Sequence, residues 1–145
     1  MTRAVVDPGV LISAFISPRG SAPDRIVRAW RNGAFELLVS PLLISELATV
    51  LTRPKFAAQA SEDRAAAYIA ALAAGSVLIE DPSERPVVTE DPGDDYLFAL
   101  ARAGRAHVVV SGDRHLTELQ DSDPPVLTPR QFADRLEAEN EADVS

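Results

Sequence analysis

The chain has 145 residues, the size of one ordinary domain, and 46% of them are apolar, which is enough for a hydrophobic core. It contains no cysteine, which excludes a disulfide framework, a zinc–thiolate site and a cysteine nucleophile. The net charge of −8 argues against a protein that coats nucleic acid by gripping its phosphates, although it does not exclude an enzyme that meets a few of them.

The charge is unevenly distributed along the chain. Residues 1–60 carry seven basic and four acidic side chains, whereas residues 61–145 carry seven basic and eighteen acidic ones. The start of the chain has no apolar signal region, and no run of about 18 apolar residues occurs anywhere. We therefore expect a soluble, cytoplasmic protein with no membrane partner.

Short apolar runs alternate with helical patterns along the chain. The run at 4–6 is rich in β-branched residues and too short for a helix, so it predicts a buried strand. Pro8 stands where a first helical turn accepts proline, and a second apolar run continues to Ile16. Further strands are expected at 35–39, 77–79, 107–111 and 125–127. Further helices are expected at 21–32, 41–52, 61–74, 92–104, 113–119 and 129–139, with a loop at 81–91.

The alternation of strands and helices predicts the fold class. Strands that are separated by helices form a parallel sheet covered on both faces, so we expect an α/β fold, a three-layer α/β/α sandwich with a central parallel sheet. No internal repeat or long linker divides the chain, which predicts a single domain over residues 1–140. Residues 141–145 are expected to be a disordered acidic tail.

Several acidic residues follow predicted strands or open predicted helices. Asp7 and Asp113 come just after strands, and Asp94 and Asp95 begin a helix. Each carboxylate can serve simply as a helix cap. In a parallel sheet, however, the carboxyl ends of the strands share one edge, where ligand sites form, so these side chains can also meet there. Ser111, two residues before Asp113, is a candidate hydrogen-bond donor to a carboxylate or a water ligand.

Glu46 lies in the middle of a predicted helix, where it caps nothing. Leu43, Glu46, Leu47 and Val50 have the spacing i, i+3, i+4, i+7, which places them on one helix face. The spacing predicts a glutamate that is buried with the apolar stripe against the sheet. A buried carboxylate needs a cation or several donors, so its partner is either an arginine or amide group, or a functional cluster.

Such a cluster has a definite chemistry. Three or four carboxylates at one edge repel one another unless a divalent cation neutralises them, and oxygen ligands without cysteine suit Mg²⁺ or Mn²⁺. A site of this kind is suited to phosphodiester hydrolysis.

His115 is a weaker candidate for the same cleft. The arginines of one predicted helix form a row that is either a solvated face or a contact for an RNA backbone or an antitoxin: Arg25, Arg28 and Arg31.

Four motifs, taken together and in order, resemble the PIN-domain nucleases. They are Val-Val-Asp at 5–7 with Val-Leu-Ile-Ser-Ala at 10–14, Ser-Glu-Leu-Ala-Thr-Val-Leu-Thr-Arg-Pro-Lys-Phe at 45–56, Asp-Pro-Gly-Asp-Asp-Tyr-Leu-Phe-Ala-Leu-Ala at 91–101, and Val-Val-Val-Ser-Gly-Asp-Arg-His-Leu at 108–116. The resemblance covers about residues 3–136. It is closest to the VapC-like toxins of toxin–antitoxin systems.

This resemblance implies a metal-dependent endoribonuclease that cleaves RNA phosphodiesters with Mg²⁺ or Mn²⁺, and the toxin of a type II toxin–antitoxin pair. It also implies a homodimer and a small antitoxin protein that fills the cleft. The family's hydroxyl residue falls on Ser111. The implied metal-binding and catalytic acids are Asp7, Glu46, one of the pair Asp94 and Asp95, with Asp95 favoured, and Asp113.

One stretch departs from the family pattern. The usual opening is Asp-Thr-Asn or Asp-Ser-Asn, whereas Asp7 is followed here by Pro8 and Gly9, which have no polar side chains. Losing groups that support metal ligands lowers metal affinity or rate rather than disrupting the fold, and Ser13 is a candidate substitute. The alternative is a catalytically weakened or inactive PIN-like domain that binds RNA or protein. A phosphoryl-transfer domain with Asp7 as nucleophile is less favoured. Receiver-type domains of that kind need a lysine after a late strand, and the only lysine of this sequence is Lys55.

Overall fold

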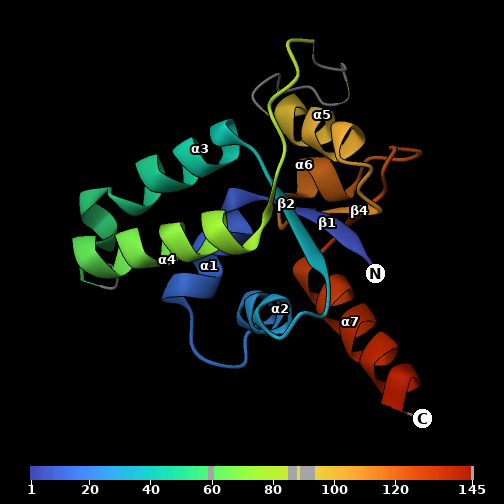
Figure 1. The fold of residues 1–145 in the computed structure, drawn as a ribbon, viewed down its shortest axis with the longest axis horizontal. Helices are drawn as coiled ribbons and strands as arrows, with labels where there is room; N and C mark the ends of the chain where they lie inside the picture. The colour runs from blue at the N-terminus through green and yellow to red at the C-terminus, as the bar shows by residue number, and fades with distance from the viewer. Residues whose placement is uncertain (59–60, 85–87, 89–93, 145) are drawn as a thin grey trace.

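The structure is a computed structural model that describes residues 1–58, 61–84, 88 and 94–144. The described strands form one sheet in the middle of the molecule, with helices on both sides (Figure 1). The strands are β1 (Arg3–Val6), β2 (Glu36–Val39), β3 (Val77–Leu78), β4 (Val108–Val110) and β5 (Val126–Leu127). The helices are α1 (Pro8–Ile16), α2 (Ala22–Arg31), α3 (Pro41–Leu51), the 3-10 helix η1 (Pro54–Phe56), α4 (Glu62–Gly75), α5 (Asp95–Ala103), α6 (Arg114–Thr117) and α7 (Pro129–Val144).

The sheet has the strand order β3-β2-β1-β4-β5, and every neighbouring pair is parallel. β1 occupies the centre, with Val5 opposite Leu38 on one side and Val109 on the other. All strands therefore point the same way, and their carboxyl ends lie along one edge. This confirms the predicted α/β class with a central parallel sheet.

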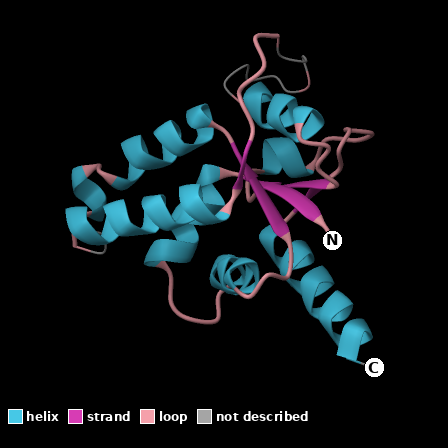
Figure 2. Cartoon of the chain, viewed as in Figure 1, coloured by secondary structure: helices cyan, strands magenta, loops and turns pink. Residues whose placement is uncertain are grey.

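Helices cover both faces of the sheet, as the colouring by secondary structure in Figure 2 makes clear. α5 contacts β1, β2 and β4 on one face, whereas α1, α2 and α7 pack together on the other (Figure 1). α3 and α4 pack against each other and project beyond the sheet as a pair (Figure 1). No helix in the described part of the chain is long and apolar enough to cross a membrane.

The hydrophobic core lies where these layers meet. The apolar residues of β1 and β4 are fully buried, and Phe98 of α5 and Phe132 of α7 are the largest fully buried side chains. Burying a side chain of this size contributes roughly 1.5–3 kcal/mol, so the core holds the ends of β1 and β4 rigidly in place.

The chain-order prediction of strands and helices agrees with the structure to within one or two residues at most boundaries. One addition is η1, where the sequence predicted only a break after α3. Another difference concerns the acidic tail, because α7 continues through Val144 instead of ending near Glu139. The segment 137–144 contains no glycine or proline, so nothing in it terminates a helix. Residue 145, most of the predicted loop at 81–91, and the predicted helix start at 92–93 lie outside the described residues.

Candidate active site

Asp7 lies at the turn from β1 into α1, at the carboxyl edge of the sheet. Its backbone N–H donates to the carbonyl of Val110 at the end of β4, at 2.8 Å. Its side chain caps α1, because Oδ1 accepts a hydrogen bond from the N–H of Gly9 at 2.9 Å. Pro8 is the first helical residue, where the N–H that proline lacks would have no partner in the helix.

Ser111 joins the ends of the two central strands. Its side chain is fully buried, and its hydroxyl donates to Oδ2 of Asp7 at 2.8 Å. The hydroxyl oxygen of Ser111 in turn accepts a hydrogen bond from the backbone N–H of Asp113 at 3.0 Å. Asp113 is exposed and caps α6, with Oδ1 accepting from the N–H of His115 at 2.9 Å. The two aspartates therefore cap their helices, and Ser111 links them at one edge of the sheet.

The prediction that Glu46 is buried is wrong, because its side chain is exposed. The buried stripe of α3 consists of Leu43, Leu47 and Leu51, at spacing i, i+4, i+8. Glu46 lies at the flank of this stripe. There its carboxylate accepts a hydrogen bond from the hydroxyl of Tyr96, which is neither an arginine nor an amide.

Tyr96 is the residue at this site that the sequence did not reveal. It lies in the first turn of α5 and is only 4% exposed, and its hydroxyl reaches across to Glu46 on α3. Burial raises the pKa of Tyr96, and the hydrogen bond to Glu46 and the negative charges of Glu46, Asp7 and Asp94 raise it further. Tyr96 therefore links α5 to Glu46 on α3, and it lies within the electrostatic influence of Asp7 and Asp94 as well.

Asp94 and Asp95 differ in their surroundings. Asp95, favoured from the sequence, is 5% exposed and accepts a hydrogen bond from the N–H of Val88 at 3.1 Å. Asp94 is half-buried, and its charge acts on Tyr96 together with those of Asp7 and Glu46. Asp94 is thus the member of the pair whose charge acts on the Tyr96 hydroxyl alongside those of Asp7 and Glu46, whereas Asp95 is buried against the backbone of Val88.

The remaining sequence candidates lie at the margin of this site. Ser13 is half-buried on α1, and within the described residues its hydroxyl forms no hydrogen bond to the acids. His115 is exposed and contacts Asp113 through its backbone. Of the arginine row, Arg25 pairs with Asp134 and Glu137, and Arg28 pairs with Asp24; the hydrogen bonds to Asp134 and Glu137 raise the pKa of Arg25.

The acidic side chains at the carboxyl edge offer only oxygen atoms as metal ligands, and oxygen ligands suit Mg²⁺ or Mn²⁺. In the described part of the chain, no three acidic or histidine side chains are close enough together to hold an ion by themselves. Mg²⁺ commonly keeps several waters and binds through one or two carboxylates together with substrate phosphates, so water and substrate would have to complete its coordination at this edge.

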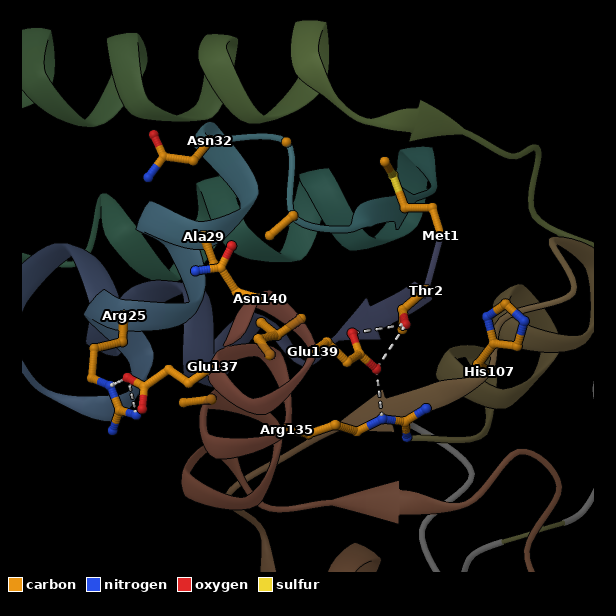
Figure 3. A pocket seen from close by; sticks show the side chains of 14 residues that line it. Met1, Thr2, Arg25, Ala29, Asn32, His107, Arg135, Glu137, Glu139 and Asn140 are labelled. Carbon is orange, nitrogen blue, oxygen red and sulfur yellow. Dashed lines mark hydrogen bonds and ion pairs between the residues drawn. The ribbon is translucent and has the colours of Figure 1, made fainter. Parts of the chain in front are cut away.

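A large hollow of about 900 Å³ lies at the opposite, amino-terminal edge of the sheet (Figure 3). Its charged residues pair with one another: Glu137 contacts Arg25, and Glu139 lies between Arg135 and Thr2 (Figure 3). The hollow is therefore separate from the acids at the carboxyl edge. The charges of Arg25, Arg135, Glu137 and Glu139 compensate one another within it.

The fold and the acidic edge agree with a known family. The family model described as PIN domain matches residues 3–115, which is most of the chain, so this chain belongs to the PIN domain family. Proteins of this family are generally nucleases. A search of curated proteins found no match.

Solved structures share the fold. The PAE2754 protein of Pyrobaculum aerophilum is 17% identical, with 95% of this chain and 90% of that chain covered and a TM-score of 0.59. VapBC2 of Rickettsia felis, solved bound to a DNA fragment from its promoter, is 9% identical, with 88% and 98% covered and a TM-score of 0.59. At these identities the likeness concerns the fold.

Proposed function

We propose that this PIN-domain protein is a metal-dependent endoribonuclease that cleaves RNA phosphodiesters. The observation that supports the proposal most directly is the pair Asp7 and Asp113, which the buried hydroxyl of Ser111 links at the ends of adjacent parallel strands. Two carboxylates fixed at one sheet edge, with others nearby, are the ligands that a phosphodiesterase needs for Mg²⁺ or Mn²⁺.

The residues proposed to hold the ion are Asp7, Glu46, Asp94 and Asp113, with Asp94 preferred to the Asp95 expected from the sequence. When bound, the divalent cation supplies Lewis acidity, a water of lowered pKa and compensation for charge on the scissile phosphate. In this arrangement Ser111 fixes one carboxylate oxygen of Asp7. Tyr96 holds the carboxylate of Glu46 at the flank of α3.

One of the structural relatives supports a proposal about the biological setting. VapBC2 is a complex whose name pairs a VapC protein with its partner, and its fold resembles that of this chain. We therefore extend the proposal to a toxin of a type II toxin–antitoxin pair, with a small antitoxin protein as partner and a homodimer as the assembly. Size-exclusion chromatography with light scattering tests the homodimer.

The central test is cleavage of a labelled single-stranded RNA with and without EDTA. We expect cleavage that requires added Mg²⁺ or Mn²⁺. The rate should fall at least about 100-fold in Asp7→Asn and in Asp113→Asn, because each variant lacks a carboxylate that holds the ion, and the ion stabilises the charged transition state by several kcal/mol. Asp63→Asn, at an exposed position in the first turn of α4, is the matched charge control. A wild-type protein that binds no Mn²⁺ would favour instead a PIN-like domain that binds RNA or protein without cleaving.

A further inference from the structure

A second hollow, of about 680 Å³, lies between α1, α2 and α4. Three arginines line it, with one aspartate: Arg28 and Arg31 from α2, Arg64 from α4, and Asp24. This composition contrasts with a chain whose net charge is −8. A nuclease of negative overall charge needs a locally positive surface to retain a polyanion, because phosphate contacts supply most of the non-specific affinity.

The arginines of this hollow are not equally available. Arg28 pairs with Asp24 at 2.9 Å, so these two charges largely compensate each other. Arg31 is exposed and forms no ion pair within the described residues, and its charge opposes the increase that burial causes in the pKa of Tyr68. The Arg64 guanidinium lies 5.4 Å from the ring centre of Phe15. Arg31 therefore presents positive charge to the hollow from α2, and Arg64 brings its guanidinium to the same hollow from α4.

The walls of the hollow are held in place by the packing. The buried hydroxyl of Tyr68 donates to the carbonyl of Leu11 at 2.7 Å, which ties α4 to α1. At the end of α4, Gly75 approaches the Trp30 ring of α2 so closely that an added Cβ would lie 2.7 Å from it. The spacing between the two arginine-bearing helices is thus set by contacts that do not involve the arginines.

We propose that this hollow, called here the arginine hollow, binds phosphates and a base of a single-stranded RNA away from the point of cleavage. Guanidinium groups match phosphate oxygens with paired hydrogen bonds, and RNA bases stack on guanidinium planes such as that of Arg64, which rests on the Phe15 ring. The proposal rests on the proposed ribonuclease function for the identity of the strand.

The position of the hollow suits a strand that also reaches the acids. Asp7 caps the first turn of α1, and Phe15 is eight residues further along the same helix, a rise of about 12 Å. That length corresponds to roughly four nucleotides of a stacked strand. The hollow would therefore hold a flanking part of the substrate, and a dinucleotide would be too short to reach it.

The test measures binding in EDTA, so that no cleavage is needed. Fluorescence anisotropy of a labelled oligouridylate should show about tenfold weaker binding to Arg31→Ala, since a charged contact is lost, and a salt dependence whose slope falls by about 0.7. Arg31→Lys should keep much of the affinity. Arg130→Ala, which removes an exposed arginine on α7, is the matched control and should bind as the wild type does.

The outcomes separate this proposal from the ribonuclease function. Equal binding by Arg31→Ala and Arg130→Ala overturns the arginine hollow as an RNA site, even if the wild type cleaves RNA. Binding that depends on Arg31 without any cleavage supports the hollow and contradicts the nuclease proposal. If polyglutamate binds in an Arg31-dependent manner and oligouridylate binding does not depend on Arg31, the hollow docks an acidic protein segment and the RNA proposal is overturned.

In cleavage assays the same variant gives a second readout. Arg31→Ala should raise the KM for a long RNA with little change in kcat, because it removes binding that is the same in the ground state and the transition state. Cleavage of a dinucleotide should be unaffected. An equal effect on the dinucleotide would contradict a flanking subsite.

Discussion

Ser111→Ala is the most informative single substitution at the candidate active site. The serine hydroxyl makes two hydrogen bonds at once, donating to Oδ2 of Asp7 at 2.8 Å and accepting from the N–H of Asp113 at 3.0 Å. Alanine removes both without adding volume. Because the serine is fully buried, water cannot readily replace the lost hydroxyl at its own position.

The expected loss of stability follows from these two contacts. A hydrogen bond to a charged group contributes about 1.5–3 kcal/mol and a neutral one about 0.5–1.5 kcal/mol. Asp7 is half-buried and Asp113 is exposed, so water compensates part of the loss on their side. We therefore expect Ser111→Ala to lower the free energy of unfolding by about 2 kcal/mol, which lowers Tm by about 4–8 °C in a chain of this size.

Stability alone does not test the role of Ser111 in orienting Asp7, so a matched control is needed. Ser40 is also fully buried, and it caps α3 by accepting from the N–H of Leu43 at 3.2 Å. Ser40→Ala should cost about 1 kcal/mol as a lost cap. Urea denaturation measures both variants on the same scale.

The readout that separates the two serines is Mn²⁺ affinity, measured by calorimetric titration of the folded proteins. Removing a group that orients a metal ligand commonly costs 10–100-fold in affinity or activity, so Ser111→Ala should show such a loss and Ser40→Ala should not. Identical Mn²⁺ affinities and cleavage rates for the two variants would refute the proposed role of Ser111.

Three further predictions concern Gly9, the pair Asp94 and Asp95, and the two buried tyrosines. Gly9→Asn should tighten Mn²⁺ binding up to about tenfold in the same titration, because a side chain fits at Gly9 without backbone strain and supplies the missing polar group. In paired cleavage and urea assays, Asp94→Asn should abolish cleavage and cost less stability than Asp95→Asn, because Asp94 is half-buried and Asp95 is almost fully buried. Asp95→Asn should instead lose about 1–3 kcal/mol of stability and keep the rate per folded molecule. Burial raises the pKa of Tyr68 and of Tyr96 above the unfolded value of about 10, so their contribution to stability is complete below pH 10 and falls above it by about 1.4 kcal/mol per pH unit for each tyrosine. Near-ultraviolet absorbance should show tyrosinate only as the protein unfolds, and earlier ionisation would contradict the burial of both rings.

Local sequence rules predicted the strands, the helices and the shared edge of Asp7 and Asp113. These features depend on short-range patterns, such as β-branched runs and capping residues, and on the rule that parallel strands end together. The prediction that Glu46 is buried failed because helical periodicity defines an apolar face only coarsely. The buried stripe of leucines on α3 lies beside Glu46 and does not include it. Asp94 and Asp95 differ by one position at a helix start, a boundary that sequence patterns do not resolve.

The contact from Tyr96 to Glu46 could not be predicted for a different reason. Every residue of α5 from Asp95 to Ala101 is buried, so the sequence of this helix gives no preferred face from which to infer a direction for the hydroxyl. The contact depends on how α5 and α3 lie relative to each other, across fifty residues of chain. A tyrosine directly after two aspartates was the available signal, and alone it does not distinguish a core residue from a member of a site.

The departure at Pro8 and Gly9 bears on metal affinity more than on the placement of Asp7. Both oxygens of Asp7 have donors, the N–H of Gly9 and the hydroxyl of Ser111, and neither donor depends on the polar side chains of the usual family opening. Pro8 at the first helical position sacrifices no helical hydrogen bond. Cleavage should therefore rise with Mn²⁺ to a plateau at high concentration, as expected for weakened binding at an intact site. A rate that stays at background at every Mn²⁺ concentration would mean that the polar pair is needed for the chemistry itself.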